Sequence, residues 1–242
     1  MSNFDNFDFN QALPLINEDT EFFPLMSPED EEEMNNEQTP EILSILPLRN
    51  TVLFPGVVIP ITVGRDKSIK LIKDAYKGDK IIGVVAQKDV NIEDPTFQEL
   101  NSIGTVAVIV KMLQMPDGNT TVIIQGKNRF KLVEEKQTEP YLKASVNKFE
   151  EVRPKVDKEF KAMVASVKEL AMQIIQFSPN IPSEAAIAIK NIDSIAFLIN
   201  FISSNMNASV ADKQLMLEVA NLRERANMVL KHLSTELQML EL

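Results

Sequence analysis

Residues 46–65 read LPLRNTVLFPGVVIPITVGR, and this stretch decides the fold class of the chain. A short apolar run leads into a loop that ends in Pro55-Gly56, and a β-branched run from Val57 to Val63 follows it. Proline cannot donate a backbone hydrogen bond, so Pro60 inside the β-branched run indicates an edge strand or a bulge. The stretch therefore predicts the start of a β-rich lobe with an edge strand after the loop.

The residues that follow alternate between β-rich runs and turns up to about residue 150. Apolar residues at helical spacing, with Gly78 as the stop, predict one helix that begins at Asp66. Asp117-Gly118 predicts a hairpin, because this dipeptide favours the tight turn between two strands. Residues 42–150 are therefore expected to form a mostly-β lobe that curls into a partial barrel. Its further strands are expected at residues 81–86, 103–112, 120–125, 130–133 and 142–146.

After Pro154 the apolar period changes from two residues to about 3.6, which indicates helices. Residues 155–208 are expected to form a helical lobe, and residues 209–242 one long helix that begins at Ser209. The heptad seam of that helix suits either packing in its own bundle or an arm that leaves the domain. The chain ends without a helix-stop signal, so we expect this helix to be cut from a longer protein. The seam consists of Leu215, Val219, Leu222, Ala226, Val229 and Leu233.

The N-terminal residues differ in charge from the rest of the chain. The first 40 residues contain 11 of the 35 acidic residues and none of the 25 basic ones, so the remainder is close to neutral. A segment with such a charge excess repels itself and buries little apolar surface. We therefore expect residues 1–41 to form an acidic, disordered tail. An alternative is a short docking segment that becomes ordered on a partner.

Composition excludes several classes of protein. The chain has no Cys, which excludes disulfides and thiolate metal sites, and its single His leaves zinc without ligands. It carries no secretory signal, and its longest apolar stretch is far shorter than a membrane span of about 20 residues. We therefore expect a cytoplasmic protein that does not enter a membrane. A near-neutral body with 6% aromatic residues makes nucleic acid an improbable partner.

No motif in the chain predicts catalysis. There is no phosphate-binding Gly-x-x-x-x-Gly-Lys loop, no Gly-x-Ser-x-Gly elbow and no His-Glu-x-x-His helix. The acidic pairs Glu134-Glu135 and Glu150-Glu151 stand on adjacent positions, whose side chains point apart. The unusual use of Met, at 11 residues, suits a surface that accepts varied apolar sequences. These features favour a binding function over an enzymatic one.

Several motifs together resemble the N-terminal, substrate-recognition domain of bacterial ATP-dependent Lon proteases. Residues 46–65 are similar to the opening signature of that family, and the resemblance covers the chain from about residue 43 to its end. The later motifs occur in the family's order: Gly104-Thr-Val-Ala107, Pro116-Asp-Gly118, Gly126-Lys-Asn-Arg-Phe130, Tyr141-Leu-Lys-Ala-Ser-Val146, Ser178-Pro-Asn180 and Lys213-Gln-Leu-Met-Leu-Glu218.

The resemblance implies an α+β fold, with a pseudo-barrel lobe followed by a helical lobe. It also implies a role in selecting misfolded, damaged and short-lived regulatory proteins for a cytoplasmic homohexamer. In that family an ATPase module, which uses ATP and Mg²⁺, and a Ser–Lys peptidase follow the N-terminal domain. Neither module lies in these 242 residues, so the chain itself is expected to do no chemistry and to hold no cofactor or metal.

The residues expected to contact substrate polypeptides are Phe54 and Pro55 in the loop, Pro60 on the edge strand, and Leu113 and Met115 near the hairpin. They are apolar and stand at or beside turns. Two alternatives to a substrate-recognition domain are a stand-alone adaptor or regulator built on the same domain, and an RNA-binding pseudo-barrel. A family branch that serves as a ubiquitin-ligase receptor needs Cys and Trp, and this chain has neither.

Overall fold

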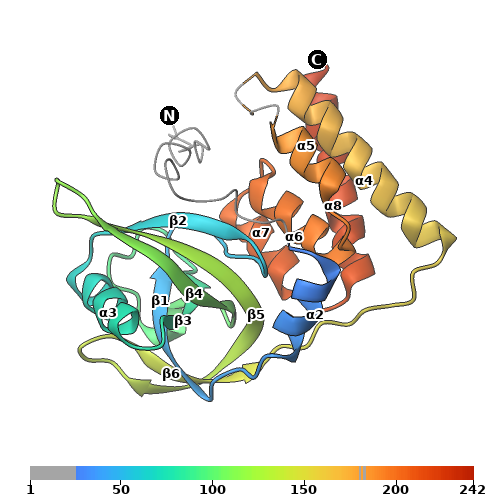
Figure 1. Cartoon of the computed structure of the whole chain (residues 1–242). Coiled ribbons are helices and arrows are strands. Elements are labelled where there is room, and N and C mark those ends of the chain that lie inside the picture. The colour runs from blue at the N-terminus through green and yellow to red at the C-terminus, as the bar shows by residue number, and fades with distance from the viewer. Residues whose placement is uncertain (1–25, 180, 182–183) are drawn as a thin grey trace.

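The computed structural model describes residues 26–179, 181 and 184–242, which form two lobes with a short helix where they meet (Figure 1). This arrangement confirms the predicted α+β fold. The short helix is α2 (Pro28–Asn36). The β-rich lobe contains β1 (Ile42–Leu48), β2 (Val58–Val63), α3 (Asp66–Lys77), β3 (Ile81–Ala86), the 3₁₀ turn η2 (Phe97–Glu99), β4 (Ile103–Gln114), β5 (Thr120–Gln137) and β6 (Lys143–Lys148). The helical lobe contains α4 (Lys158–Phe177), α5 (Glu184–Asn191), α6 (Ile195–Asn205), α7 (Val210–Glu218) and α8 (Leu222–Leu240).

The β-rich lobe is a barrel closed by one long strand. The sheet order is β2-β5-β4-β3-β1-β6, and a further pairing of β5 with β6 closes a ring from which only β2 is excluded. The first part of β5 pairs with β2 and its last part with β6. The strands predicted at residues 120–125 and 130–133 are therefore one strand of 18 residues. β2, which carries Pro60, is the edge strand that the sequence predicted.

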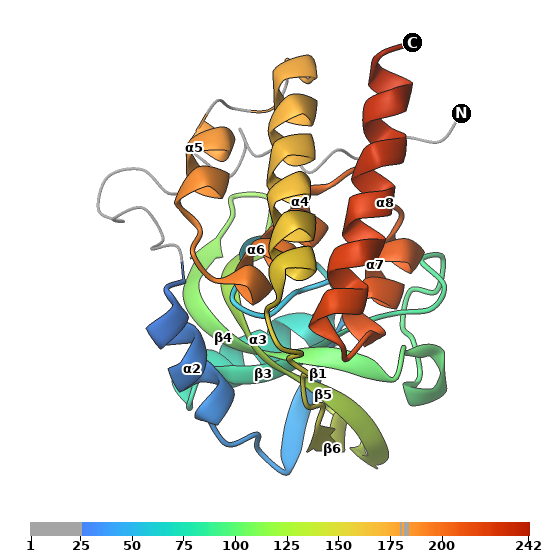
Figure 2. The same cartoon turned by 90° about the vertical axis from the view of Figure 1, so that its right-hand side faces the viewer.

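Helices α4 and α8 lie side by side along the length of the helical lobe (Figure 2). The apolar seam predicted from the sequence faces α4 and the core, since Leu222, Ala226, Val229 and Leu233 are all buried. Leu215 does not belong to this seam in the structure, because it lies on α7 and is 55% exposed. The seam therefore serves packing within the lobe, which was one of its two predicted uses.

The expectation of one helix over residues 209–242 is wrong, because the chain breaks at Val219–Asn221 into α7 and α8. Asn221 caps α8 by accepting hydrogen bonds from the amides of Arg223 and Glu224 at 2.9 and 3.2 Å. The guanidinium of Arg129, on β5, donates to the carbonyls of Leu217 and Val219 at 2.7 and 2.9 Å. The β-rich lobe thus satisfies the carbonyls at the end of α7.

The expectation that residues 1–41 form a disordered tail is wrong for the part that the structure describes, because Pro28–Asn36 form α2. Residues 1–25 lie outside the described residues. Ser27 and Asp30 form a capping box, in which each side chain accepts a hydrogen bond of 3.1 Å from the other's amide. Acidic side chains in the first turn also stabilise a helix, because they face the positive end of its dipole. The acidic run is therefore a helix start.

A half-buried lysine gives the helical lobe a predicted pH dependence. The ammonium of Lys213 donates to the carbonyl of Ser204 at 2.8 Å, and burial lowers its pKa to about 8 although the carboxylate of Glu236 acts in the opposite direction. The folded state loses this proton at a lower pH than the unfolded state does. The free energy of unfolding therefore rises as the pH rises from about 8 to about 10.5. We expect wild type to gain stability relative to Lys213→Met over this range in urea unfolding. A difference that stays constant with pH would contradict the assignment.

Candidate polypeptide-binding surface

Two of the five predicted contact residues lie in the core. Phe54 is 1% exposed, and Pro55 is also buried. The side-chain amide of Asn200, on α6, donates to the carbonyl of Pro55 at 3.2 Å and so attaches the loop to the helical lobe. Phe54 and Pro55 therefore join the two lobes, and in this structure neither side chain is open to a polypeptide. Their position in a turn-rich apolar stretch suits such a junction as well as it suits an exposed surface.

The other three, Pro60, Leu113 and Met115, are half-buried. The register of the sheet places Thr62 opposite Thr121, and Thr121 opposite Leu113, so these three side chains form one row. Pro60 lies two residues from Thr62 and thus on the same face of the sheet. Pro60 and Leu113 are therefore brought to one face. Met115 lies just beyond, in the hairpin turn, where its amide donates to the carbonyl of Asn119 at 2.9 Å.

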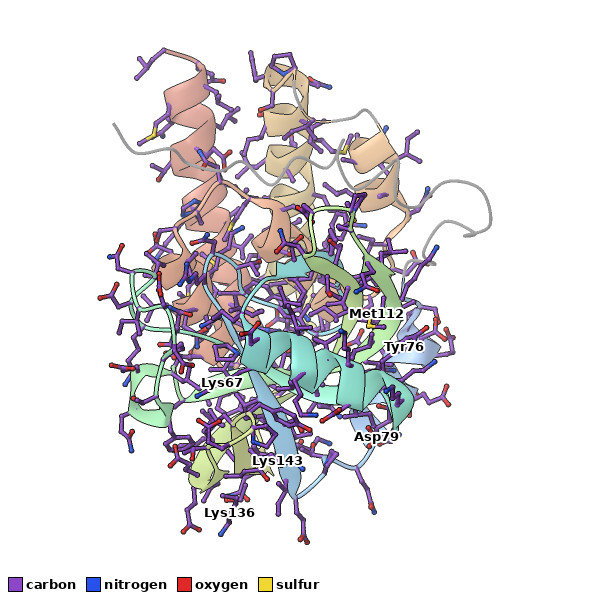
Figure 3. The ribbon with its side chains drawn as sticks, turned by 90° about the vertical axis from the view of Figure 1, so that its left-hand side faces the viewer. Lys67, Tyr76, Asp79, Met112, Lys136 and Lys143 are labelled. Carbon is purple, nitrogen blue, oxygen red and sulfur yellow. The ribbon has the colours of Figure 1, made fainter. Side chains whose placement is uncertain are left out.

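The opposite face of the same strands packs on the core. Ile61, Val122 and Met112 form the next row across β2, β5 and β4. Met112 and Tyr76 of α3 lie close together where the helix crosses the sheet (Figure 3), and both are half-buried against the core. The covered face fixes the hairpin, so its outer face has a defined orientation. Sequence reasoning did not separate these faces, because the alternation of apolar residues breaks at the bulge between Ile109 and Lys111.

Strand β2 presents an open edge beside this surface. Among the described residues it pairs with β5 alone. In an antiparallel ladder, alternate residues point their backbone groups away from the partner strand, so β2 has carbonyls and amides directed outward. Pro60 removes one amide, which limits pairing with other copies of the same edge. We define the outer surface as Pro60, Thr62, Leu113 and Met115, together with this edge. It offers apolar contacts and backbone hydrogen bonds to an extended chain.

A hollow of about 250 Å³ lies where α3 begins and is lined by Arg65, Lys67, Asp94, Phe97 and Tyr141, among others. Its two basic side chains already have partners within the chain. The ammonium of Lys67, labelled in Figure 3, lies 3.0 Å from Asp94 and 2.9 Å from Glu139, and hydrogen bonds to Glu139 and Asp94 raise its pKa. The guanidinium of Arg65 donates to the carbonyls of Glu93 and Pro47. The cations of the hollow are thus held by groups of the chain itself, and the carboxylate of Glu135 is a further charge in its lining.

The described residues contain no cluster of three or more His, Asp or Glu side chains that could hold a metal ion. Within the same residues, no helix is both long and apolar enough to span a membrane. Among the groups described above, the outer surface on β2 and the hairpin is the one that combines half-exposed apolar side chains with unpaired backbone.

Comparison with known proteins identifies a family for this arrangement. The family model described as the ATP-dependent protease La (LON) substrate-binding domain matches residues 42–235. The chain is 59% identical over 234 residues to the Lon protease of Flavobacterium johnsoniae, covering 96% of this chain and 29% of that protein. It is 51% identical over 229 residues to the Lon protease of Cytophaga hutchinsonii, covering 94% of this chain and 28% of that protein.

A solved structure shares the fold. The N-terminal domain of Mycobacterium avium complex Lon protease superimposes with a TM-score of 0.64 at 21% identity, covering 80% of this chain and 98% of that one. The present chain spans less than a third of the length of the two Lon relatives named above.

Proposed function

Because the chain belongs to the family of substrate-binding domains of the ATP-dependent protease La (Lon), we propose that it binds unfolded or damaged polypeptides and directs them to Lon proteolysis. The observation that carries this proposal is the outer surface. There, Pro60, Leu113 and Met115 offer apolar contact next to the edge of β2 that pairs with no strand among the described residues. Neither kind of contact depends on a particular sequence, so the surface suits polypeptides that have only exposed apolar residues and free backbone in common.

We extend this proposal to the complete enzyme. We propose that the chain acts together with an ATPase module, which uses ATP and Mg²⁺, and with a Ser–Lys peptidase. In this proposal the complete subunits assemble into a cytoplasmic hexamer, and the present chain supplies recognition and gating without chemistry or a cofactor of its own.

Site-specific photocrosslinking tests the binding surface. A photoreactive phenylalanine analogue replaces Leu113 or Met115 in separate variants, and each variant is illuminated with reduced, carboxymethylated α-lactalbumin, which cannot refold. We expect crosslinks from both positions, because an extended chain on β2 passes next to them. The control places the same analogue at Val133, an apolar residue that is 52% exposed on the distal part of β5. Crosslinking at Val133 equal to that at Leu113 and Met115 would show nonspecific contact and remove this surface from the proposal.

A further inference from the structure

Helix α2 lies where the two lobes meet (Figure 1), and it precedes the region that the family model matches, residues 42–235. It therefore lies outside the residues that the family model matches. Its apolar side chains are nevertheless part of the main core. Met34 is 4% exposed, and Met26, just before the helix, is 7% exposed. A nine-residue helix has little intrinsic stability, so these tertiary contacts must hold it in place.

The C-terminal end of α2 is held by the β-rich lobe. The side-chain amide of Asn128, on β5, donates to the carbonyls of Met34 and Glu37 at 2.8 and 3.4 Å. The ammonium of Lys148, on β6, donates to the carbonyl of Asn35 at 2.6 Å. These groups satisfy carbonyls that the end of a helix leaves without partners, and the lysine also places positive charge at the negative end of the dipole.

The middle of α2 is held by the helical lobe. Glu31 is 4% exposed, and its carboxylate accepts hydrogen bonds from the hydroxyl of Ser194 and from the guanidinium of Arg153. Arg153 lies in the linker between the lobes, and Ser194 is the N-cap of α6, where its hydroxyl also accepts from the amide of Phe197 at 3.1 Å. One side chain of α2 therefore contacts both the linker and the start of α6.

The contact of Glu31 continues through the junction as a chain of polar side chains. Arg153 also lies 3.1 Å from the carboxylate of Glu151, which in turn pairs with the guanidinium of Arg225, on α8. Arg225 donates to the side-chain carbonyl of Asn200 at 2.9 Å, and Asn200 holds the carbonyl of Pro55. The network thus runs from α2 through the linker, α8 and α6 to the loop ahead of β2.

Three residues pack tightly where the loop ahead of β2 meets α6, namely Gly56, Phe197 and Met26. Gly56 has a φ of +79°, and a Cβ atom built on it would lie 2.9 Å from the ring of Phe197 and 3.0 Å from the sulfur of Met26. Met26, the loop and α6 therefore touch at one point. A displacement of the segment around Met26 leaves a gap between the loop and α6, and interiors tolerate such gaps poorly.

We infer that α2, when it is docked, restricts motion between the two lobes, and that the contacts of Glu31 hold it in the docked position. The helix touches β5 and β6 on one side, and the linker and α6 on the other. When it is docked, it therefore opposes rotation of one lobe relative to the other. When it leaves, Ser194 and Arg153 lose a shared partner, and the contact between Gly56 and Phe197 loses Met26.

The test measures the distance between the lobes in the full chain. Because the sequence contains no Cys, the two substitutions Lys73→Cys on α3 and Ser166→Cys on α4 each accept one spin label. Both sites are exposed, with one in each lobe. Double electron–electron resonance then gives the distribution of distances between the labels. Amide hydrogen exchange shows whether α2 is docked.

Three variants are compared in this labelled background. Glu31→Lys puts a second cation beside Arg153 and is expected to release α2. Met34→Ser removes the buried apolar side chain without adding charge. It provides a second measurement if Glu31→Lys does not fold. Glu32→Lys is the matched control, since it makes the same charge change at an exposed position of the same helix.

In Glu31→Lys and Met34→Ser we expect a broader distance distribution and exchange about tenfold faster in residues 54–57 and 194–200. Glu32→Lys is expected to behave as wild type. Two results would overturn the inference. In one, α2 exchanges freely while the distribution stays as narrow as in the control, so the helix does not restrict the lobes. In the other, α2 remains protected from hydrogen exchange in Glu31→Lys, so the contacts of Glu31 do not hold the helix in place.

Discussion

Replacing Arg225 with alanine is expected to lower the free energy of unfolding by about 3–5 kcal/mol, because it breaks a buried ion pair by removing one partner. Arg225 is 1% exposed, pairs with Glu151 and donates to Asn200 at 2.9 Å. Burial lowers its pKa although Glu151 acts in the opposite direction. The variant leaves the side-chain carbonyl of Asn200 unpaired and a cavity in the junction. Urea unfolding followed by circular dichroism measures the loss.

A neighbouring arginine on the same helix provides the control. Arg223 pairs with Asp157 at 3.1 Å and with Glu159 at 2.7 Å, but both carboxylates are largely open to solvent. Water replaces such partners at small cost, so Arg223→Ala is expected to destabilise the chain far less than Arg225→Ala. Equal losses from the two substitutions would mean that the buried network has no special role in stability.

The second large effect is expected at Gly126. A Cβ atom at this position would lie 2.2 Å from the carbonyl oxygen of Phe54 and 3.0 Å from its carbonyl carbon. Both atoms belong to the backbone, so no side-chain rotation relieves the clash. The same glycine also exchanges hydrogen bonds with the loop, since its carbonyl accepts from Gly56 at 2.8 Å and its amide donates to Val57 at 2.9 Å. Gly126→Ala must therefore push the loop away from β5, at a cost of about 2–3 kcal/mol.

Gly78→Ala is the matched control for this substitution. Its Cβ atom would lie 3.5 Å from the nearest carbonyl, that of Asp74, which is ordinary contact. Thermal unfolding of both variants is expected to show a larger drop in melting temperature for Gly126→Ala than for Gly78→Ala. If Gly126→Ala melts with wild type, the loop has more freedom than its contacts indicate.

The strands and their order along the chain could be predicted from local patterns. Runs such as Ile81–Ala86 are β-branched and bounded by turn residues, and Pro60 marks the edge strand through its missing amide. The break before α8 could not be found in this way, because the heptad seam continues through it. Asn221 is a local helix-start residue at the break, but the end of α7 is capped by Arg129, a residue about 90 positions earlier. Tertiary contacts overrode a regular helical pattern there.

Helix α2 shows a local signal that was present but outweighed. Ser27, Pro28 and Asp30 form a helix-start pattern, yet the acidic run next to them suggested a tail. The candidate surface was predicted in part for a related reason. Pro60 and Leu113 lie on one face, as the hairpin allows, whereas Phe54 turned inward because the helical lobe covers its loop. Periodicity within one lobe carries no information about what the other lobe covers.

The separation of α2 from its partners along the chain also decides when it can fold. During synthesis α2 is made first, but Asn128 follows Met34 by 94 residues and Ser194 follows Glu31 by 163. At ordinary rates of translation these two intervals last roughly five to thirty seconds. Met26 and Met34 lack these partners through that time, and the acidic residues around them favour contact of the helix with water. The first helix that the structure describes is thus among the last to reach its final position.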